Sequence, residues 1–279
     1  MKKIIHNSIN IGLISLLFTT NMYAGDRDFT YTYQSLVLDK GNRELELWFT
    51  YLDGSDNFLF NSLKHRAEFE IGLGKHVQTA FYLNLGYSAR QSATITSFDV
   101  ESGVAIFSPY IQKDFSMSFS NEWKWQMSDP VANAIGSALY GEFTVGPDEF
   151  ALEGKIILDK KIGNFVTALN LVGEVEYEPE ITEPGESEVT IEWEKEQAVE
   201  VFYGLSYLFS PNFSAGIELK NKNEFHEGEI ESVLYGGPAF SYKSENWWMA
   251  FTALPEIKNF SEEVGSGAIE SRLIFSYHF

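Results

Sequence analysis

The sequence lacks cysteine entirely, and this excludes disulfide bridges, a thiolate nucleophile and metal sites built on thiolates. It is also poor in positive charge, with 20 Lys and Arg against 40 Asp and Glu in 279 residues. The resulting net charge of −20 repels polyanions, so we expect no nucleic-acid partner. Past residue 24 there is no run of about 18 uninterrupted apolar residues, which excludes a transmembrane helix there. A membrane role would have to be carried by strands.

The N-terminal residues have the layout of a secretory signal peptide. Lys2 and Lys3 precede a short apolar run at 11–18, and the small residue Ala24 stands before a polar region. The apolar run is too short to span a bilayer. We predict three parts of the chain: a cleaved signal peptide at 1–24, a short N-terminal periplasmic segment at 25–42, and a transmembrane β-barrel domain at 43–279. Because so few residues precede the first strand, we expect no folded plug domain.

Apolar and polar residues alternate from residue 43 onward, which sends successive side chains to opposite faces of a sheet. In the first run, Leu45, Leu47 and Phe49 share one face, while Glu44 and Glu46 share the other. Such runs recur along the whole chain and are long enough to cross a bilayer when tilted. They predict about twelve strands, near 43–52, 63–74, 76–90, 113–126, 134–145, 149–160, 163–178, 190–208, 212–224, 230–243, 245–254 and 268–279.

Short and long connections between these strands alternate, as in the turn at 74–76 and the loop at 53–62. The fold class we predict is therefore all-β: an antiparallel up-and-down transmembrane β-barrel with short periplasmic turns and longer extracellular loops. The region 91–112 is open to two interpretations, a long loop or a further pair of strands. Pro238 lies inside a predicted strand and cannot donate to the ladder, so we expect a bulge or break there.

The polar faces of the strands are rich in charge, which a dry interior could not hold. A closed sheet must then enclose water and turn its apolar face to lipid. Besides Glu44 and Glu46, the predicted lumen-lining acidic residues are Glu68, Glu70, Glu122, Glu142, Glu153, Glu174, Glu196, Glu200 and Glu218. The predicted lumen-lining basic residues are Arg66, Lys124, Lys155, Lys220 and Arg272.

Aromatic residues near strand ends would form the interfacial girdles of a membrane barrel; they include Tyr51, Trp123, Trp125, Tyr177, Trp193, Tyr207, Trp247 and Trp248. At the C-terminus Leu273, Phe275, Tyr277 and Phe279 alternate with more polar residues. This terminal pattern resembles the last strand of bacterial outer-membrane β-barrel proteins. The resemblance implies recognition by the barrel-assembly machinery and location in the outer membrane of a Gram-negative bacterium. Segments 43–51 and 67–84 are similar to uncharacterised outer-membrane proteins, which implies no particular activity.

The excess of acids predicts a small cation-preferring channel or passive transporter, with outer-membrane lipid and small cationic or neutral solutes as partners. An alternative is a closed structural or surface-interaction barrel. A third, less favoured hypothesis is an outer-membrane phospholipase-like hydrolase, for which His65 is the best-placed histidine but lacks an evident serine. We expect no enzyme activity and no cofactor, and no metal-binding spacing occurs. The acidic loop at 178–188 is expected to be solvated and mobile; the alternative is that it gathers divalent cations, which prefer oxygen ligands.

Overall fold

The computed structural model describes residues 25–54, 60–99, 104–147, 149–181, 191–226, 229–261 and 267–279. The predicted signal peptide at 1–24 and most of the acidic loop, at 182–190, lie outside the described residues. Within the described ranges, no helix has the length and apolarity that crossing a membrane requires.

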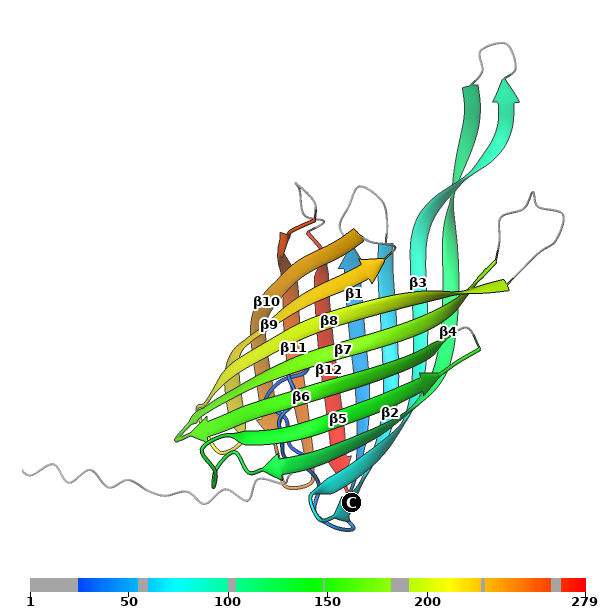
Figure 1. Ribbon diagram of the computed structural model, residues 1–279. Helices are drawn as coiled ribbons and strands as arrows, with labels where there is room; N and C mark the ends of the chain where they lie inside the picture. The colour runs from blue at the N-terminus through cyan, green and yellow to red at the C-terminus, as the bar shows by residue number, and fades with distance from the viewer. Residues whose placement is uncertain are drawn as a thin grey trace, which may run out of the picture.

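Twelve antiparallel strands close into one barrel, in which each strand pairs with its neighbours in sequence and β1 pairs with β12 (Figure 1). The predicted all-β, up-and-down topology is confirmed. The strands are β1 (Arg43–Gly54), β2 (Phe60–Gly74), β3 (Val77–Asp99), β4 (Val104–Ser128), β5 (Gly136–Val145), β6 (Phe150–Ile162), β7 (Phe165–Ile181), β8 (Ile191–Leu208), β9 (Phe213–His226), β10 (Glu229–Lys243), β11 (Trp247–Asn259) and β12 (Ile269–His278).

The uncertain region at 91–112 belongs to β3 and β4, which pair with each other from Val77 to Asp99 and add no further strands. The barrel is therefore twelve-stranded. In Figure 1 this hairpin extends well past the rim of the barrel at the end opposite the C-terminus. Near Pro238 the ladder between β10 and β11 runs from Val233 to Tyr235 with a register shift and resumes at Ala239, whereas the pairing with β9 is continuous.

The two faces of the sheet divide as the alternation predicts. On β1, Phe49 is 43% exposed on the outside, whereas Glu44 and Glu46 are at most 1% exposed on the inside. The C-terminal residues Phe275, Tyr277 and Phe279 are also exposed on the outer face. This is the arrangement of a transmembrane barrel, in which apolar side chains meet lipid and polar ones line the interior.

Trp248 does not belong to an interfacial girdle, contrary to the prediction. It is fully buried inside the barrel, where its indole N–H donates to the Glu44 carboxylate. Trp247, one residue earlier, lies on the outer face and stacks on Phe275. Two adjacent tryptophans in a strand must face opposite sides, and only one of them can meet lipid.

Most of the predicted N-terminal segment at 25–42 lies inside the barrel: residues 25–38 are buried or half-buried, whereas residues 39–42 are exposed. The segment forms the blue coil seen within the lower part of the barrel in Figure 1, at the same end as the C-terminus. Phe29, Thr30, Thr32 and Ser35 are completely buried there. We call residues 25–42 the lumenal segment. A folded plug domain is not needed to fill this end of the lumen, because an irregular stretch of chain anchored by side chains of the wall is sufficient.

Candidate functional site: the barrel lumen

The lumenal segment is held at its centre by one carboxylate of the barrel wall. Glu218 on β9 accepts backbone N–H bonds from Thr30, Tyr31 and Thr32 at 3.0, 3.0 and 2.7 Å. It also accepts the hydroxyls of Thr30 and Thr252. Buried backbone N–H groups need acceptors, and an ionised carboxylate is a strong one. Glu218 therefore supplies the hydrogen-bond acceptors that a neighbouring strand would supply in a sheet.

Further along the segment, three other strands take over this role. Asn170 on β7 accepts the Tyr33 N–H at 2.6 Å and donates to the Tyr33 carbonyl at 2.9 Å, so its amide copies a backbone partner. Asp159 on β6 accepts the Ser35 N–H at 3.1 Å, and Gln78 on β3 accepts the Leu38 N–H at 3.0 Å. The chain thus passes from β9 round the inner wall to β3.

The start of the segment is fixed by an ion pair and by packing. Asp28 lies 2.9 Å from the Lys243 ammonium group and accepts the Ser214 hydroxyl. The Phe29 ring lies over Gly204, where a Cβ atom would approach the ring to 2.8 Å. Glycine at this wall position therefore makes room for the aromatic ring.

Above the segment, cationic side chains stack on aromatic rings across the lumen. The Arg272 guanidinium lies 3.9 Å from the centre of the Tyr31 ring, and the Lys155 ammonium lies 4.2 Å from that of Tyr33. From below, Arg27 lies 4.1 Å from the centre of the same Tyr33 ring. Burial raises the pKa of Tyr33 to about 12, so the ring between these two cations is neutral. These cation–π contacts join side chains of the lumenal segment to side chains of the wall. We call Tyr31, Tyr33 and the three cationic side chains the aromatic layer.

A cavity of about 570 Å³ lies between the aromatic layer and the end of the barrel opposite the C-terminus, and we call it the vestibule. Tyr31, Tyr33 and Trp48 line it, and it extends to the end of the barrel with the long connections, where Pro147 and Pro179 line it. Its charged lining residues are Glu142, Glu149, Glu153, Glu174, Glu176, Glu178, Glu200, Lys64, Arg66, Lys155, Lys220, Lys222 and Arg272.

Several of the vestibule charges form ion pairs across neighbouring strands. Lys155 lies 2.9 Å from Glu153, and Arg66 lies 3.4 Å from Glu142. Lys220 lies 3.1 Å from Glu270. The basic side chains are thereby largely balanced by acids of the wall.

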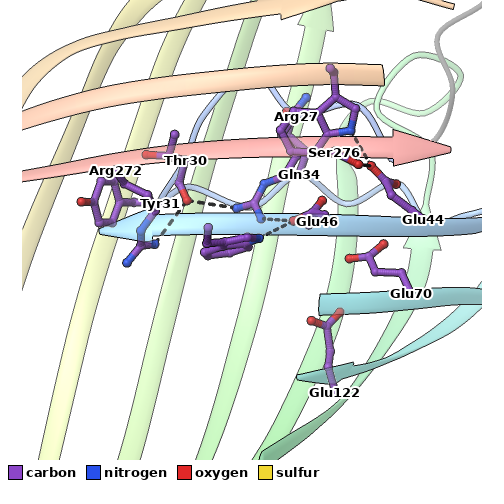
Figure 2. A network of polar contacts seen from close by, with 12 residues as sticks. Arg27, Thr30, Tyr31, Gln34, Glu44, Glu46, Glu70, Glu122, Arg272 and Ser276 are labelled. Atoms are coloured by element: carbon purple, nitrogen blue, oxygen red, sulfur yellow. Dashed lines mark hydrogen bonds and ion pairs between the residues drawn. The ribbon is translucent and has the colours of Figure 1, made fainter. Parts of the chain in front are cut away.

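On the inner side of the segment lies a smaller cavity of about 20 Å³, which shares the lining residue Tyr33 with the vestibule. Carboxylates crowd this end. We call Glu44, Glu46, Glu68, Glu70 and Glu122 the acidic cluster; each is at most 7% exposed. Figure 2 shows Glu44, Glu46, Glu70 and Glu122 on the wall, with Glu46 next to Arg27. Arg27 and Lys124 are the basic residues that line the small cavity.

The predicted lumen residues therefore fall into three groups. Around the vestibule lie Glu142, Glu153, Glu174, Glu200, Arg66, Lys155, Lys220 and Arg272. At the inner end lie Glu68, Glu70, Glu122 and Lys124. Glu218 is buried against the lumenal segment, and Glu196 is half-buried and lines neither cavity.

Reasoning from the sequence missed the lumenal segment as part of the site. One signal was available: residues 28–35 contain three aromatic residues among small hydroxyl residues, a composition unusual for an exposed leader. His65, the residue considered for a hydrolase, donates from Nδ1 to the Trp48 carbonyl oxygen at 2.9 Å and contacts the Phe49 ring. These contacts do not supply the serine that ester hydrolysis requires.

Solved structures with this architecture are outer-membrane barrels. The chain is similar to the COG4313 outer membrane channel from Pseudomonas putida F1, with 10% identity and a TM-score of 0.58 over 87% of this chain and 97% of that one. It is also similar to the β domain of the Bordetella autotransporter BrkA, with 8% identity and a TM-score of 0.54 over 86% of this chain and 100% of that one. At these identities the likeness shows the fold, that of bacterial outer-membrane β-barrels.

Within that class, residues 21–271 match the model of a family of unknown function, DUF6662, and the chain belongs to this family. No curated protein matches the sequence.

Proposed function

We propose that this protein is a passive outer-membrane channel for small polar solutes, with the lumenal segment as its constriction. The vestibule carries this proposal: a cavity of about 570 Å³, lined by charged side chains, lies inside a membrane-type barrel and extends to one of its ends. A barrel that served only as a scaffold would gain nothing from so large a polar cavity. The channel named in the structural comparison has the same fold, which is compatible with this function but does not carry it.

We further propose that the channel prefers cations. The vestibule bases Arg66, Lys155 and Lys220 each lie within 4.0 Å of an acid. Among the described residues, no ion pair of this kind balances Glu174 or Glu176. The vestibule lining holds seven acids against six bases, because Lys64, Lys222 and Arg272 also line it. Most of the negative excess therefore comes from the acidic cluster, and this excess would attract cations and repel anions.

The lumenal segment makes the constriction because it divides the vestibule from the inner end. Tyr31 and Tyr33 line the vestibule, and the cavity on the other side of Tyr33 has a volume of about 20 Å³. In this arrangement solutes pass only when the segment shifts away from the wall. The open state would then be governed by the bonds to Glu218, Asn170 and Asp159.

A closed barrel whose loops interact with the cell surroundings is the second candidate. The dense hydrogen bonding of the lumenal segment favours it, since four strands of the wall each bind the segment. In that case the vestibule would be a binding pocket and not a path.

Conductance separates the two candidates. The purified barrel would be added to planar lipid bilayers in a gradient of potassium chloride, and single-channel currents and the reversal potential recorded. Conductance steps with a reversal potential on the cation-selective side are expected. Anion-selective steps would remove the cation preference, and the absence of steps both from the intact chain and from a chain without the lumenal segment would remove the channel.

The remaining functional assignments belong to the same proposal. Residues 1–24 would direct export, and the C-terminal strand ending in Phe279 would be recognised by the barrel-assembly machinery. The outer membrane of a Gram-negative bacterium is the location that follows. We propose no enzyme activity, and the absence of ester hydrolysis in phospholipid micelles would be the matching measurement.

A further inference from the structure

Four members of the acidic cluster form two pairs of like charges on the neighbouring strands β1 and β2. In the register of β1 with β2, Glu44 stands directly opposite Glu70, and Glu46 stands directly opposite Glu68. Like charges in directly opposed positions destabilise a sheet, and burial strengthens the repulsion. The fold therefore needs a positive charge at this place.

Most members of the cluster have donors of their own. Glu46 accepts the Trp48 indole N–H at 2.6 Å, and Glu70 accepts the Gln78 amide at 3.2 Å. Glu44 accepts Trp248 and Ser276, and Glu122 accepts Tyr82. These contacts place and orient the carboxylates but add no formal positive charge.

Glu68 is different. It is 1% exposed, and neither of its carboxylate oxygens has a hydrogen-bond partner among the described residues. A buried ionised carboxylate without a partner costs several kcal/mol or more, so a group of this kind either takes up a proton or binds a cation. One oxygen of Glu68 lies within 4.8 Å of one oxygen each of Glu46 and Glu70.

We propose that Glu46, Glu68 and Glu70 bind a calcium ion. Calcium takes carboxylate oxygens at about 2.3–2.6 Å, so two ligands on opposite sides of it lie up to about 5 Å apart. The spacing of these three carboxylates falls within that limit. Magnesium, at about 2.1 Å, requires a tighter group and keeps more of its water.

The surroundings provide room and charge for this ion. The small cavity beside the cluster, of about 20 Å³, is lined by Glu46 and Glu70 and can hold a water molecule as a further ligand. Arg27 lies 3.9 Å from Glu46, so one cationic side chain already approaches the cluster from the lumenal segment. The five carboxylates of the cluster outnumber Arg27 and Lys124 by three. The calcium ion would supply the missing charge and fasten β1 to β2 beneath the segment.

Terbium luminescence tests the proposal, because Tb³⁺ binds calcium sites and is excited through nearby tryptophan. The Trp48 indole contacts the ligand Glu46 directly, so a bound Tb³⁺ would be sensitised. The folded barrel in detergent, stripped with a chelator, would be titrated with Tb³⁺ and then with Ca²⁺. Sensitised emission that Ca²⁺ displaces is expected, with about one site per chain by calorimetry.

Variants assign the site. Glu68→Gln and Glu70→Gln are each expected to weaken Ca²⁺ binding by about tenfold or more, because each removes a charged ligand. Glu194→Gln is the matched control, since Glu194 is exposed on β8 and carries the same charge. A shift in gel mobility on heating would verify that every variant is folded.

The proposal is overturned if the wild-type chain binds no Ca²⁺ at millimolar concentration, since a shared proton would then balance the cluster. It is also overturned if both glutamine variants bind as tightly as the wild type, or if Glu194→Gln loses binding equally. None of these results bears on conductance, so the channel and the calcium site succeed or fail separately.

Discussion

The outer and inner halves of the lumen are built by the same strands with the same alternation, yet they differ in what fills them. In the vestibule the charges of the wall face open space, and Lys155 and Arg66 reach acids of neighbouring strands. In the inner half a stretch of chain occupies the space, and the wall residues turn their carboxylates and amides toward its backbone. Water solvates polar groups in the first half, whereas in the second each group must find a protein partner.

The difference shows that a barrel interior is not one environment. Alternation determines which residues point inward, but the content of the lumen determines whether they are solvated or buried. Glu174 and Glu218 have equivalent positions in the pattern, yet Glu174 lines the vestibule and Glu218 is 1% exposed. The following variants would open the filled inner half of the lumen or measure how much its contacts contribute to stability.

Deletion of residues 26–38 should have the largest effect. It removes the division between the two halves and leaves the lumen continuous, so single-channel conductance in planar bilayers is expected to rise severalfold. The heat-dependent shift in gel mobility should persist, because the strand pairing does not involve these residues. Unchanged conductance in the folded variant would show that the lumenal segment is not the constriction.

Gly204→Leu should displace the lumenal segment from the wall without deleting it. A side chain at this position collides with the Phe29 ring, whose atoms lie 2.8 Å from the site of the new Cβ. We expect more frequent opening than in the wild type, recorded as open probability. Gly173→Leu on β7 is the matched control, since a Cβ there meets nothing within 4 Å.

Glu218→Ala should have the next largest effect, because three backbone N–H groups lose their acceptor. Donors left without partners cost about 1–3 kcal/mol each when buried, and water entering the gap recovers part of this. A loss on the order of 3 kcal/mol in the free energy of unfolding in urea is therefore expected. Glu224→Ala on the same strand removes only a half-exposed ion pair with Lys222 and should change stability by less than about 1 kcal/mol.

Glu68→Gln should change stability in opposite directions with and without calcium. With a chelator present, the variant loses an unpartnered buried charge and is expected to be more stable than the wild type by about 1–3 kcal/mol. With saturating calcium the wild type should gain stability from binding and the variant should not. Equal urea midpoints for the two proteins in both conditions would argue against a buried charge at this position.

The double variant Glu174→Gln and Glu176→Gln should have the smallest effect. Both residues line the vestibule, where water screens them, so we expect a modest shift of the reversal potential toward anions and unchanged stability. The shift of the reversal potential should be larger at low salt than at high salt, because dissolved ions screen the charges of these two residues.

The strands and their faces follow from the sequence because alternation is a local property. Positions 44–51 predict the outside and inside of β1 without reference to any other part of the chain. Twelve strands could be counted in the same way, and the uncertainty at 91–112 arose because β3 and β4 continue alternating beyond the barrel rim.

The content of the lumen does not follow from local patterns. The bond between Thr30 and Glu218 joins residues 188 positions apart, and nothing near either residue identifies the other. The placement of Trp248 inside the barrel follows from alternation with Trp247, but its partner Glu44 is 204 positions away and could not be predicted locally. The acidic cluster likewise depends on the register of β1 with β2, which aligns Glu46 with Glu68.

The route of the lumenal segment also constrains how the molecule is assembled. Its anchors include Lys243 on β10 and Ser214 on β9, which are synthesised long after residues 25–42. The start of the described chain therefore cannot take its final position until the late strands have joined the sheet. The lumenal segment therefore docks late in folding. An intermediate with a partly formed barrel and a water-filled lumen precedes the native state.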